Sequence, residues 1–415
     1  MQNRGYAFLI EFKARGFFYQ CTDEEALAQA LNQPYSAAYI GFDCTAASLH
    51  VGNLMQIMIL RLLQKYDIKP IIIVGGGTTK IGDPSFKEET RKLLLDEDIA
   101  VNMIGVKNSI AKFVDFDKDG NNAIMLNNAD WLDQLNYMKF LRDYGRHFSV
   151  NRMLTFDSVK SRLKREHSLS LLEFNYMVLQ AFDFFVLNRD HNCILQCGGS
   201  DQWGNIINGI ELTRRISGNT LFGITTPLIT TASGVKMGKT IMGAIWLNEN
   251  LLSSYNYYQF WRNCEDGDVF RFMRLYTDLT LMQIANYEQD NDTNINEYKK
   301  ILAYAATKLC HGKNNADRAA QTAQNIFEKG IIEGVEQFEL VAKDIAKGIL
   351  LCELLTRSGL TSSNGEARRL INGGGAKLNN QKVIDECHKV FIKDFSEGYL
   401  ILSSGKKRFI KILLT

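Results

Sequence analysis

Two short segments of the sequence carry residues that could bind a polyphosphate. In the first, Cys44–Asn53, His50 and Gly52 stand where a helix is expected to begin after an apolar strand. The free N–H groups and the dipole at a helix start favour phosphate, and a glycine lets a nucleotide approach the backbone closely. Thr45 and His50 could add hydrogen-bond donors. Taken alone, the segment could equally be a capped helix with a structural glycine.

The second segment is Lys236-Met237-Gly238-Lys239-Thr240, which lies outside any clear helix or strand pattern. Two lysines on a glycine-containing loop would bring positive charge to a leaving pyrophosphate. A solvated basic loop is the alternative for any single lysine pair.

The hydrophobic pattern predicts the elements that position these segments. Short apolar runs alternate with helical patterns, which is typical of a doubly wound α/β sheet over residues 36–235. The expected strands are 37–43, 70–74, 123–126 and 193–196, and the expected buried helix is 54–66. Asp133–Arg165 reads as a helical insertion, residues 248–345 as helical, and residues 348–415 as an α/β mixture.

Composition limits the class of protein. A chain of 415 residues is expected to form two or three domains. Its net charge of +2 means that any nucleic-acid partner needs a local basic surface. The eight scattered cysteines fit buried thiols in a reducing compartment, and the spacing of Cys193 and Cys197 gives no metal site. No signal peptide or membrane span is visible, so we expect a cytoplasmic protein.

In this order on an α/β sheet, the two segments resemble the HIGH and KMSKS signatures of class I aminoacyl-tRNA synthetases. Asn53 stands where the second histidine of the first signature often lies, and Gly238 replaces the serine of the other. The resemblance implies a Rossmann-type catalytic domain over residues 1–247 with a helical insertion near 133–165. It also implies a helical domain for the tRNA anticodon region over 248–345 and an α-L type RNA-binding domain over 348–415.

Further motifs resemble those of bacterial tyrosyl-tRNA synthetases, from about residue 17 to the C-terminus. These motifs are residues 39–43 (YIGFD), 82–85 (GDPS), 176–183 (YMVLQAFD) and 196–205 (QCGGSDQWGN). Tyr176, Gln180 and Asp183 share one helix face by their spacing. A buried carboxylate and phenol reject a substrate that lacks a hydroxyl, a contrast for which this family is the standard example. The resemblance implies a tyrosine site made of Tyr39, Asp83, Tyr176, Gln180, Asp183 and Gln202.

The same resemblance implies an ATP site. Its residues are Asp43, His50, Gly52, Asn53, Gly198, Gly199, Asp201 and Lys239. The cations and donors that bind the transition state would be Thr45, His50, Lys87, Arg91, Lys236, Lys239 and Thr240. Gly198 and Gly199 would let a ribose approach, and Asp201 would accept its hydroxyl protons. The co-substrate is ATP with Mg²⁺, and no protein-bound metal is expected.

The C-terminal segment is similar to the α-L RNA-binding motif. Its candidate contacts to a sugar–phosphate backbone are Arg368, Arg369, Lys377 and Lys382. Asn364 and Ala376 depart from the arginine and valine that relatives often carry at these positions. A solvated helix with a basic tail is the alternative.

The resemblance implies that tyrosine's carboxylate attacks the α-phosphorus of ATP, and that a tRNA(Tyr) ribose hydroxyl then takes the tyrosyl group. The carboxylate is already ionised, so the first step needs no general base. The family is homodimeric, which implies pairing through the segment near 133–165. A tryptophanyl enzyme, a non-catalytic RNA-binding factor and a generic nucleotidyltransferase are the alternatives.

Overall fold

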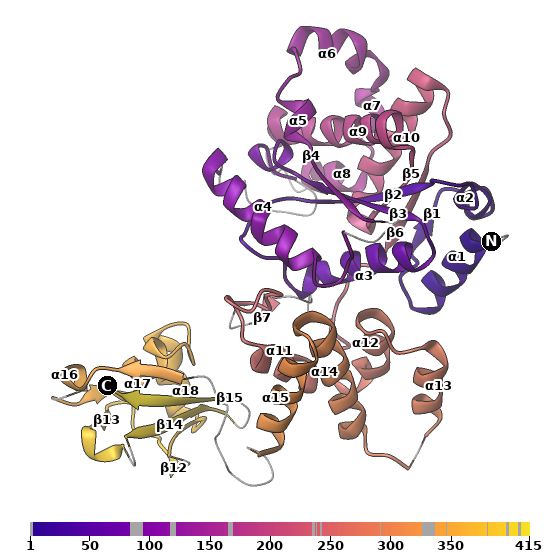
Figure 1. Cartoon of the computed structure of the whole chain (residues 1–415). Helices are drawn as coiled ribbons and strands as arrows, with labels where there is room; N and C mark the ends of the chain where they lie inside the picture. The colour runs from indigo at the N-terminus through magenta and orange to yellow at the C-terminus, as the bar shows by residue number, and fades with distance from the viewer. Residues whose placement is uncertain are drawn as a thin grey trace. The chain divides into compact units, whose positions relative to one another are not determined.

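A six-stranded sheet organises the larger part of the chain, with strand order β1-β6-β5-β2-β3-β4 (Figure 1). The strands are β1 (Gln20–Cys21), β2 (Ala37–Phe42), β3 (Lys69–Val74), β4 (Ile124–Asn127), β5 (Cys193–Gly199) and β6 (Phe222–Thr226). The pairs β2–β3, β2–β5, β3–β4 and β5–β6 are parallel, and β1 joins β6 antiparallel. The predicted doubly wound α/β sheet is therefore confirmed.

The contacts within this computed structural model divide the chain into two units. The first is 1–238, 246–251 and 265–298, and the second is 239–245, 252–264 and 299–415. These units do not test the predicted domain limits 1–247, 248–345 and 348–415, which stay a prediction. The structure describes residues 3–83, 94–116, 122–164, 169–234, 237, 239–240, 243–290, 292–325, 337–345, 347–379, 381–395, 398–405 and 408–415.

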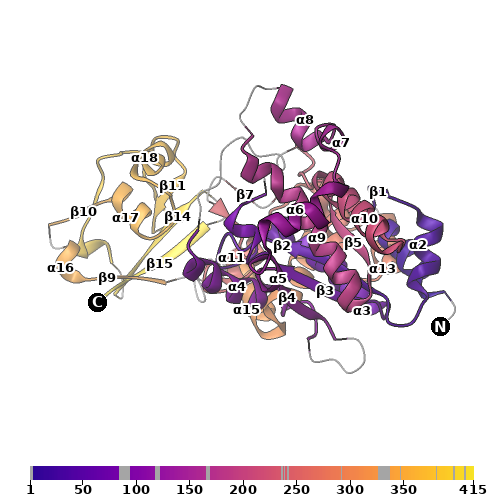
Figure 2. The ribbon, with the colours of Figure 1, turned by 90° about the horizontal axis from the view of Figure 1, so that it is seen from above.

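Helices cover both faces of the six-stranded sheet (Figures 1 and 2). α9 (Leu171–His191) and α10 (Trp203–Ser217) lie on one face, and α3 (Val51–Lys65) lies on the other. α9 begins at a capping box of Ser170 with Glu173 and ends at Asn192, whose φ of 52° is left-handed. These caps fix the length of the helix that carries three of the predicted tyrosine-site residues.

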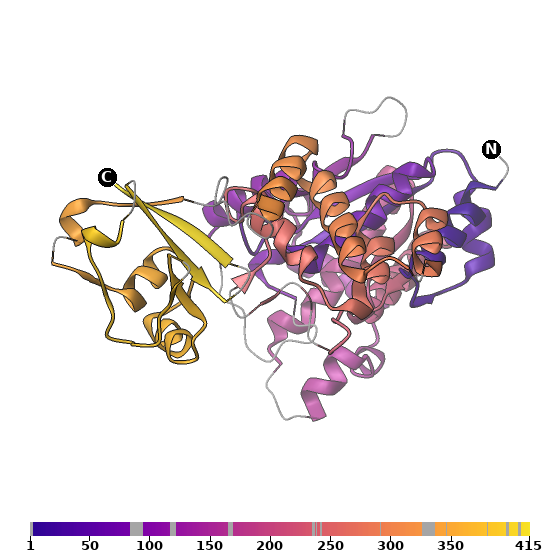
Figure 3. The ribbon, with the colours of Figure 1, turned by 90° about the horizontal axis from the view of Figure 1, so that it is seen from below.

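An N-terminal helix, α1 (Arg4–Ala14), belongs to the first unit, although the sequence pattern before about Arg15 predicts no element. Its Phe8 and Phe12 are fully buried. Figure 3 shows this indigo segment beside the sheet, together with α2 (Glu24–Leu31). The burial of α1 is secured by the carboxylate of Glu11, which accepts hydrogen bonds from Arg15 and from Lys65 on α3.

Further helices complete the first unit. They are α4 (Asp96–Ile110), α5 (Ala129–Leu132), α6 (Tyr137–Asp143), α7 (Val150–Met153), α8 (Asp157–Lys164), α12 (Val269–Tyr276) and α13 (Leu281–Gln289). Phe140 and Met153 pack on α9, while Tyr137, Met138 and Val150 remain exposed by 67%, 71% and 57%. The part of the chain that holds α6 and α7 therefore has one buried and one exposed apolar side.

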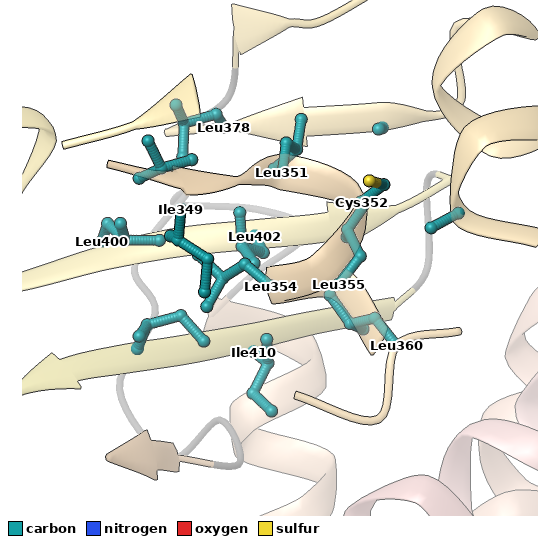
Figure 4. Close-up of a cluster of buried hydrophobic side chains, with 14 of the residues drawn as sticks. Ile349, Leu351, Cys352, Leu354, Leu355, Leu360, Leu378, Leu400, Leu402 and Ile410 are labelled. Carbon is teal, nitrogen blue, oxygen red and sulfur yellow. The ribbon is translucent and has the colours of Figure 1, made fainter. Parts of the chain in front are cut away.

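The second unit contains its own hydrophobic core. α17 (Leu351–Arg357) and α18 (Asn364–Asn372) pack on a five-stranded sheet of order β12-β11-β14-β15-β9. Figure 4 shows Leu354 and Leu355 of α17 against Leu402 and Ile410 of this sheet. The strands are β9 (Gln337–Leu340), β11 (Ala376–Leu378), β12 (Gln381–Lys382), β14 (Tyr399–Ser404) and β15 (Arg408–Leu414). The unit also holds the helices α11 (Ser254–Arg262) and α15 (Lys313–Gln324), the part of α14 (Ile295–His311) from Lys299 on, and the hairpin β7 (Lys239–Thr240) with β8 (Gly243–Ala244).

Candidate active site

The turn that follows β2 places His50 as the N-cap of α3. Its Nδ1 accepts the N–H of Gly52 at 3.0 Å, and the Asn53 side chain accepts the N–H of His50 at 3.2 Å. Because Nδ1 is an acceptor, the ring proton lies on Nε2. His50, Gly52 and Asn53 thus form one reciprocal cap, with a helix N-terminus suited to an anion. Thr45 is exposed in the same turn.

The lysine-bearing segment approaches this cap at Met237. A Cβ added to Gly52 would lie 3.2 Å from the Met237 carbonyl oxygen, so the glycine allows the two backbones to pass closely. Met237 is buried, and its sulfur accepts a hydrogen bond from the Tyr276 hydroxyl at 3.7 Å. Lys87, Arg91, Lys236 and Gly238 lie outside the described residues. Lys239 and Thr240 form β7, and the structure describes only their backbone.

A buried carboxylate lies at the centre of the predicted tyrosine site. Asp183 is 3% exposed and accepts hydrogen bonds from Asn128 Nδ2 at 3.0 Å and from Trp131 Nε1 at 2.7 Å. Burial raises the pKa of Asp183 to about 7, although both donors oppose the shift. The nearby Asp43 charge adds to the rise. Asp183 therefore combines a fixed orientation with a proton that exchanges near neutral pH.

Tyr39 projects from β2 into the same region. Burial raises the pKa of its phenol, and the charge of Asp183 raises it further. Its ring packs on Phe184 with centroids 5.1 Å apart. Among the described residues, its buried hydroxyl has no hydrogen-bond partner. A buried hydroxyl next to a buried carboxylate is suited to bind another hydroxyl.

A second group of predicted residues is joined by hydrogen bonds. Gln202 Nε2 donates to Asp83 at 2.8 Å. Asn205 Nδ2 donates to Gln180 at 2.8 Å and to Gln202 at 3.1 Å. These contacts bring Asp83, Gln180 and Gln202 together, as a polar site for an ammonium group requires.

Tyr176 does not belong to this hydrogen-bonded group; it lies next to Asp43. Its hydroxyl donates to Asp43 Oδ1 at 3.3 Å, and Thr78 Oγ1 donates to the same oxygen at 3.2 Å. Asn128 Nδ2 donates to Thr78 as well as to Asp183. Thr78 and Asn128 therefore connect Asp43, at the end of β2, with Asp183 on α9.

The predicted ribose residues follow β5. Gly198 and Gly199 end the strand, and a Cβ added to Gly199 would collide with the Asp201 carboxylate. A Cβ at this position would require the Asp201 carboxylate to move. Thr226, at the end of the neighbouring β6, donates to the Gly198 carbonyl at 3.4 Å. The glycines and Asp201 thus lie at the same sheet edge as the end of β2.

Comparison with known proteins identifies the family. Residues 31–328 match the family of tRNA synthetases class I (W and Y). The tyrosine–tRNA ligase of Rickettsia bellii (strain RML369-C) is 56% identical over 409 residues, which cover 98% of this chain and 99% of that protein. The chain belongs to the class I tyrosine–tRNA ligases. The resemblance inferred from the sequence is therefore confirmed.

Two further matches support membership of the tyrosine–tRNA ligases. Residues 327–412 match the SYY-like C-terminal domain of this family. The crystal structure of a C-terminally truncated mitochondrial tyrosyl-tRNA synthetase from Aspergillus nidulans aligns with a TM-score of 0.70 and 28% identity. It covers 77% of this chain and 94% of that one. No helix within the described residues is long and apolar enough to cross a membrane.

Sequence reasoning missed several polar residues of this tyrosine–tRNA ligase site. Asn128 and Trp131 follow β4, and a polar pair at the carboxyl end of a parallel strand was a signal that could have found Asn128. Gln196 stands beside Tyr39 in the register of β5 and β2. Its Oε1 is buried without a partner among the described residues. Of the motif at residues 196–205, the predicted sites include Gly198, Gly199, Asp201 and Gln202 but not Gln196.

The predicted RNA-binding residues lie in the second unit. Arg368 and Arg369 are exposed on α18. Lys377 pairs directly with Lys382 in the register of β11 and β12. Like charges directly opposite each other destabilise a sheet unless an anion lies between them or nearby. The arrangement therefore suits a phosphate backbone.

Proposed function

We propose that the chain activates L-tyrosine with Mg²⁺–ATP and transfers the tyrosyl group to the 3′ end of tRNA(Tyr) for protein synthesis. The observation that carries this proposal is the pair of Tyr39 and Asp183. A buried phenol and a carboxylate held by Asn128 and Trp131 can hold a substrate hydroxyl. Phenylalanine would leave these polar groups unpaired, and tryptophan carries no hydroxyl to fill the position.

In the first step, the tyrosine carboxylate oxygen forms a bond to the α-phosphorus, and the bond from that phosphorus to the bridging oxygen breaks. Pyrophosphate leaves with the negative charge. Asp83, Tyr176, Gln180 and Gln202 would orient the amino acid. The His50 cap and the cations Lys87, Arg91, Lys236 and Lys239 would stabilise the charge on the phosphates.

In the second step, a ribose hydroxyl at the 3′ end of the tRNA attacks the carbonyl carbon of tyrosyl-adenylate. The new ester bond forms, AMP leaves with the electron pair, and the hydroxyl proton is released. Arg368, Arg369, Lys377 and Lys382 would hold the sugar–phosphate backbone of the same tRNA. Their charge, rather than the net charge of the chain, supports this assignment.

Exchange of labelled pyrophosphate into ATP tests the activation step. We expect exchange with tyrosine and background rates with tryptophan and phenylalanine. Exchange that is faster with tryptophan would replace the proposal by a tryptophanyl activity. Absence of exchange with all three amino acids would favour a non-catalytic RNA-binding factor.

We also propose that the chain forms a homodimer in the cytoplasm. Tyr137, Met138 and Val150 offer an exposed apolar surface on α6 and α7, which a second copy could cover. The cytoplasmic location is proposed from the free cysteines; for example, burial raises the pKa of the Cys44 thiol to about 12, so this thiol stays protonated and inert. Sedimentation at micromolar concentration should give the mass of a dimer. A stable monomer under assay conditions would contradict this part of the proposal.

A further inference from the structure

A buried hydrogen-bonded cluster joins α4 to the His50 turn. Ser109 of α4 is fully buried, and Ser48 and Asn248 are 3% and 8% exposed. Ser109 Oγ accepts the N–H of Leu49 at 3.1 Å and lies 3.2 Å from Ser48 Oγ. It also lies 2.9 Å from the Gly105 carbonyl, one turn back on its own helix. One side chain of α4 therefore holds the backbone directly before His50.

The same cluster reaches the chain that returns from the lysine-bearing segment. The N–H of Asn248 donates to Ser48 Oγ at 3.2 Å, and the N–H of Leu247 donates to the Leu49 carbonyl at 2.9 Å. Asn248 Nδ2 donates to the carbonyls of Gly105 at 3.0 Å and Ala47 at 3.4 Å. A backbone bridge between His50 and Trp246 extends the contact.

Close packing leaves the turn little freedom to shift. A Cβ added to Gly105 would collide with the Ala47 carbonyl, so α4 lies directly on the turn. Asn102, one turn earlier on α4, donates to the Cys44 carbonyl at 2.9 Å. The carbonyls of Cys44, Ala47 and Leu49 and the N–H of Leu49 are thus paired with α4 or with residues 247–248, as buried polar groups require.

We propose that Ser109 and Asn248 are positioning residues of the adenylation step. They hold the His50 turn against α4 and residues 246–248 in one geometry, so that the phosphate-binding start of α3 is fixed before ATP binds. The inference rests on the proposed function, because it assigns its effect to phosphate transfer. A displacement of about 1 Å in such a site lowers a rate by about a hundredfold.

The contacts predict which kinetic constant changes. Ser109→Ala removes the acceptor of the Leu49 N–H, and Asn248→Ala removes the Nδ2 group that donates to Ala47 in the turn and to Gly105 in α4. Neither residue contacts Tyr39, Asp183 or Asn128 through any described hydrogen bond. The rate constant of tyrosyl-adenylate formation should fall by about tenfold or more, while the dissociation constant of tyrosine changes by less than about twofold.

The experiment measures both constants for full-length variants by stopped-flow fluorescence and equilibrium titration with tyrosine. Thr213→Val is the matched control, since Thr213 is fully buried and its hydroxyl donates to a carbonyl one turn back, Gly209, as Ser109 does on α4. It should leave both constants unchanged. The double variant Ser109→Ala with His50→Ala should raise the activation free energy of adenylate formation by less than the two single variants together, because both act through one turn.

If Ser109→Ala and Asn248→Ala form tyrosyl-adenylate as fast as the control Thr213→Val, the proposal is overturned. Equal losses in rate and in tyrosine affinity would also overturn it, because they would show a general folding role. If Ser109→Ala does not fold, Asn248→Ala alone decides between these outcomes. A wild-type chain that forms no tyrosyl-adenylate would overturn the proposed function and this inference with it, whereas an active wild type isolates the inference.

Discussion

Asp183 combines two hydrogen-bond donors with a pKa of about 7, and this combination predicts a pH-dependent affinity for tyrosine. The ionised carboxylate accepts a phenol hydrogen bond more strongly than the neutral acid does. The affinity should therefore be highest above pH 7 and fall by up to about tenfold per unit as pH decreases below it. Titration of tyrosine binding between about pH 5.5 and 8.5 measures this. The Asp183→Asn variant should bind tyrosine weakly, with an affinity that does not depend on pH in this range. A wild-type affinity that does not change with pH would contradict the assignment.

The Tyr39 hydroxyl predicts opposite effects on stability and on binding. It is buried without a partner among the described residues, which costs folding free energy that Tyr39→Phe would recover. We expect the unfolding free energy to rise by about 1 kcal/mol and the affinity for tyrosine to fall by about tenfold. Thermal denaturation and equilibrium titration measure the two effects. Tyr258→Phe, a buried tyrosine in α11, serves as a control for binding. A stabilised variant with full affinity would remove Tyr39 from the site.

At this scale, the sequence predicted side chains that share one helix or one motif. Asp183 could be placed because it follows Gln180 on the same helix face. The hydrogen bonds of Asn128 and Trp131 to Asp183 could not be predicted, because they join residues 55 and 52 positions apart in the chain. The raised pKa of Asp183 could not be predicted either, because it depends on how deeply the tertiary structure buries this carboxyl.

At the scale of the elements, α4 packs closely on the turn before His50, and the substitution Gly105→Ala tests this contact. Replacing a glycine inside a helix by alanine usually stabilises the protein by about 0.5–1 kcal/mol. At Gly105, however, the added Cβ would meet the Ala47 backbone carbonyl, which cannot move aside. We expect a lower melting temperature and an adenylation rate at least about tenfold below wild type. Gly365→Ala in α18 has no atom nearer than 3.9 Å and should be neutral or stabilising in the same assays. Equal behaviour of both variants would contradict the contact.

The strands β2 and β3 were predictable because apolar residues buried on both faces form continuous runs. α1 was not, because Glu11 interrupts its apolar residues in the sequence and Arg15 follows directly after its end. Both are 8% exposed in the fold, since Glu11 pairs with Arg15 and Lys65. Tertiary pairing therefore hides a helix that the sequence pattern alone does not reveal.

Across the whole molecule, the Glu11 network ties α1 to α3 and predicts acid sensitivity. Although burial alone would raise it, hydrogen bonds from Lys65, Tyr66 and Arg15 lower the pKa of Glu11 to about 2. Because this pKa lies below the ordinary value of 4.5, the stabilisation is complete above pH 4.5 and is lost as pH falls towards 2. Melting temperatures should fall more steeply in this window for wild type than for Glu11→Gln. Glu24→Gln is the control, because the Glu24 side chain is 41% exposed where it pairs with Lys13. Parallel curves for wild type and Glu11→Gln would contradict the prediction.

The second unit allows the two reaction steps to be separated. Arg368→Ala with Arg369→Ala removes exposed charge from α18 without touching the buried Ala367 and Ile371. The KM for tRNA should rise by about tenfold and its salt dependence should weaken, while pyrophosphate exchange stays at the wild-type rate. Aminoacylation at several salt concentrations measures this. Lys343→Ala with Lys347→Ala removes the same charge elsewhere in the unit, and an equal loss there would show that only net charge matters.

The antiparallel edge between β1 and β6 has a consequence for synthesis on the ribosome. Gln20 lies against Thr225, which is 205 residues later in the chain. At about 5–20 residues per second, roughly 10–40 s pass before the N-terminal segment meets its partner strand. During this interval the apolar residues of α1 and α2 have no completed sheet edge beside them. Nascent chains halted before residue 222 should therefore be the ones that chaperones bind most strongly.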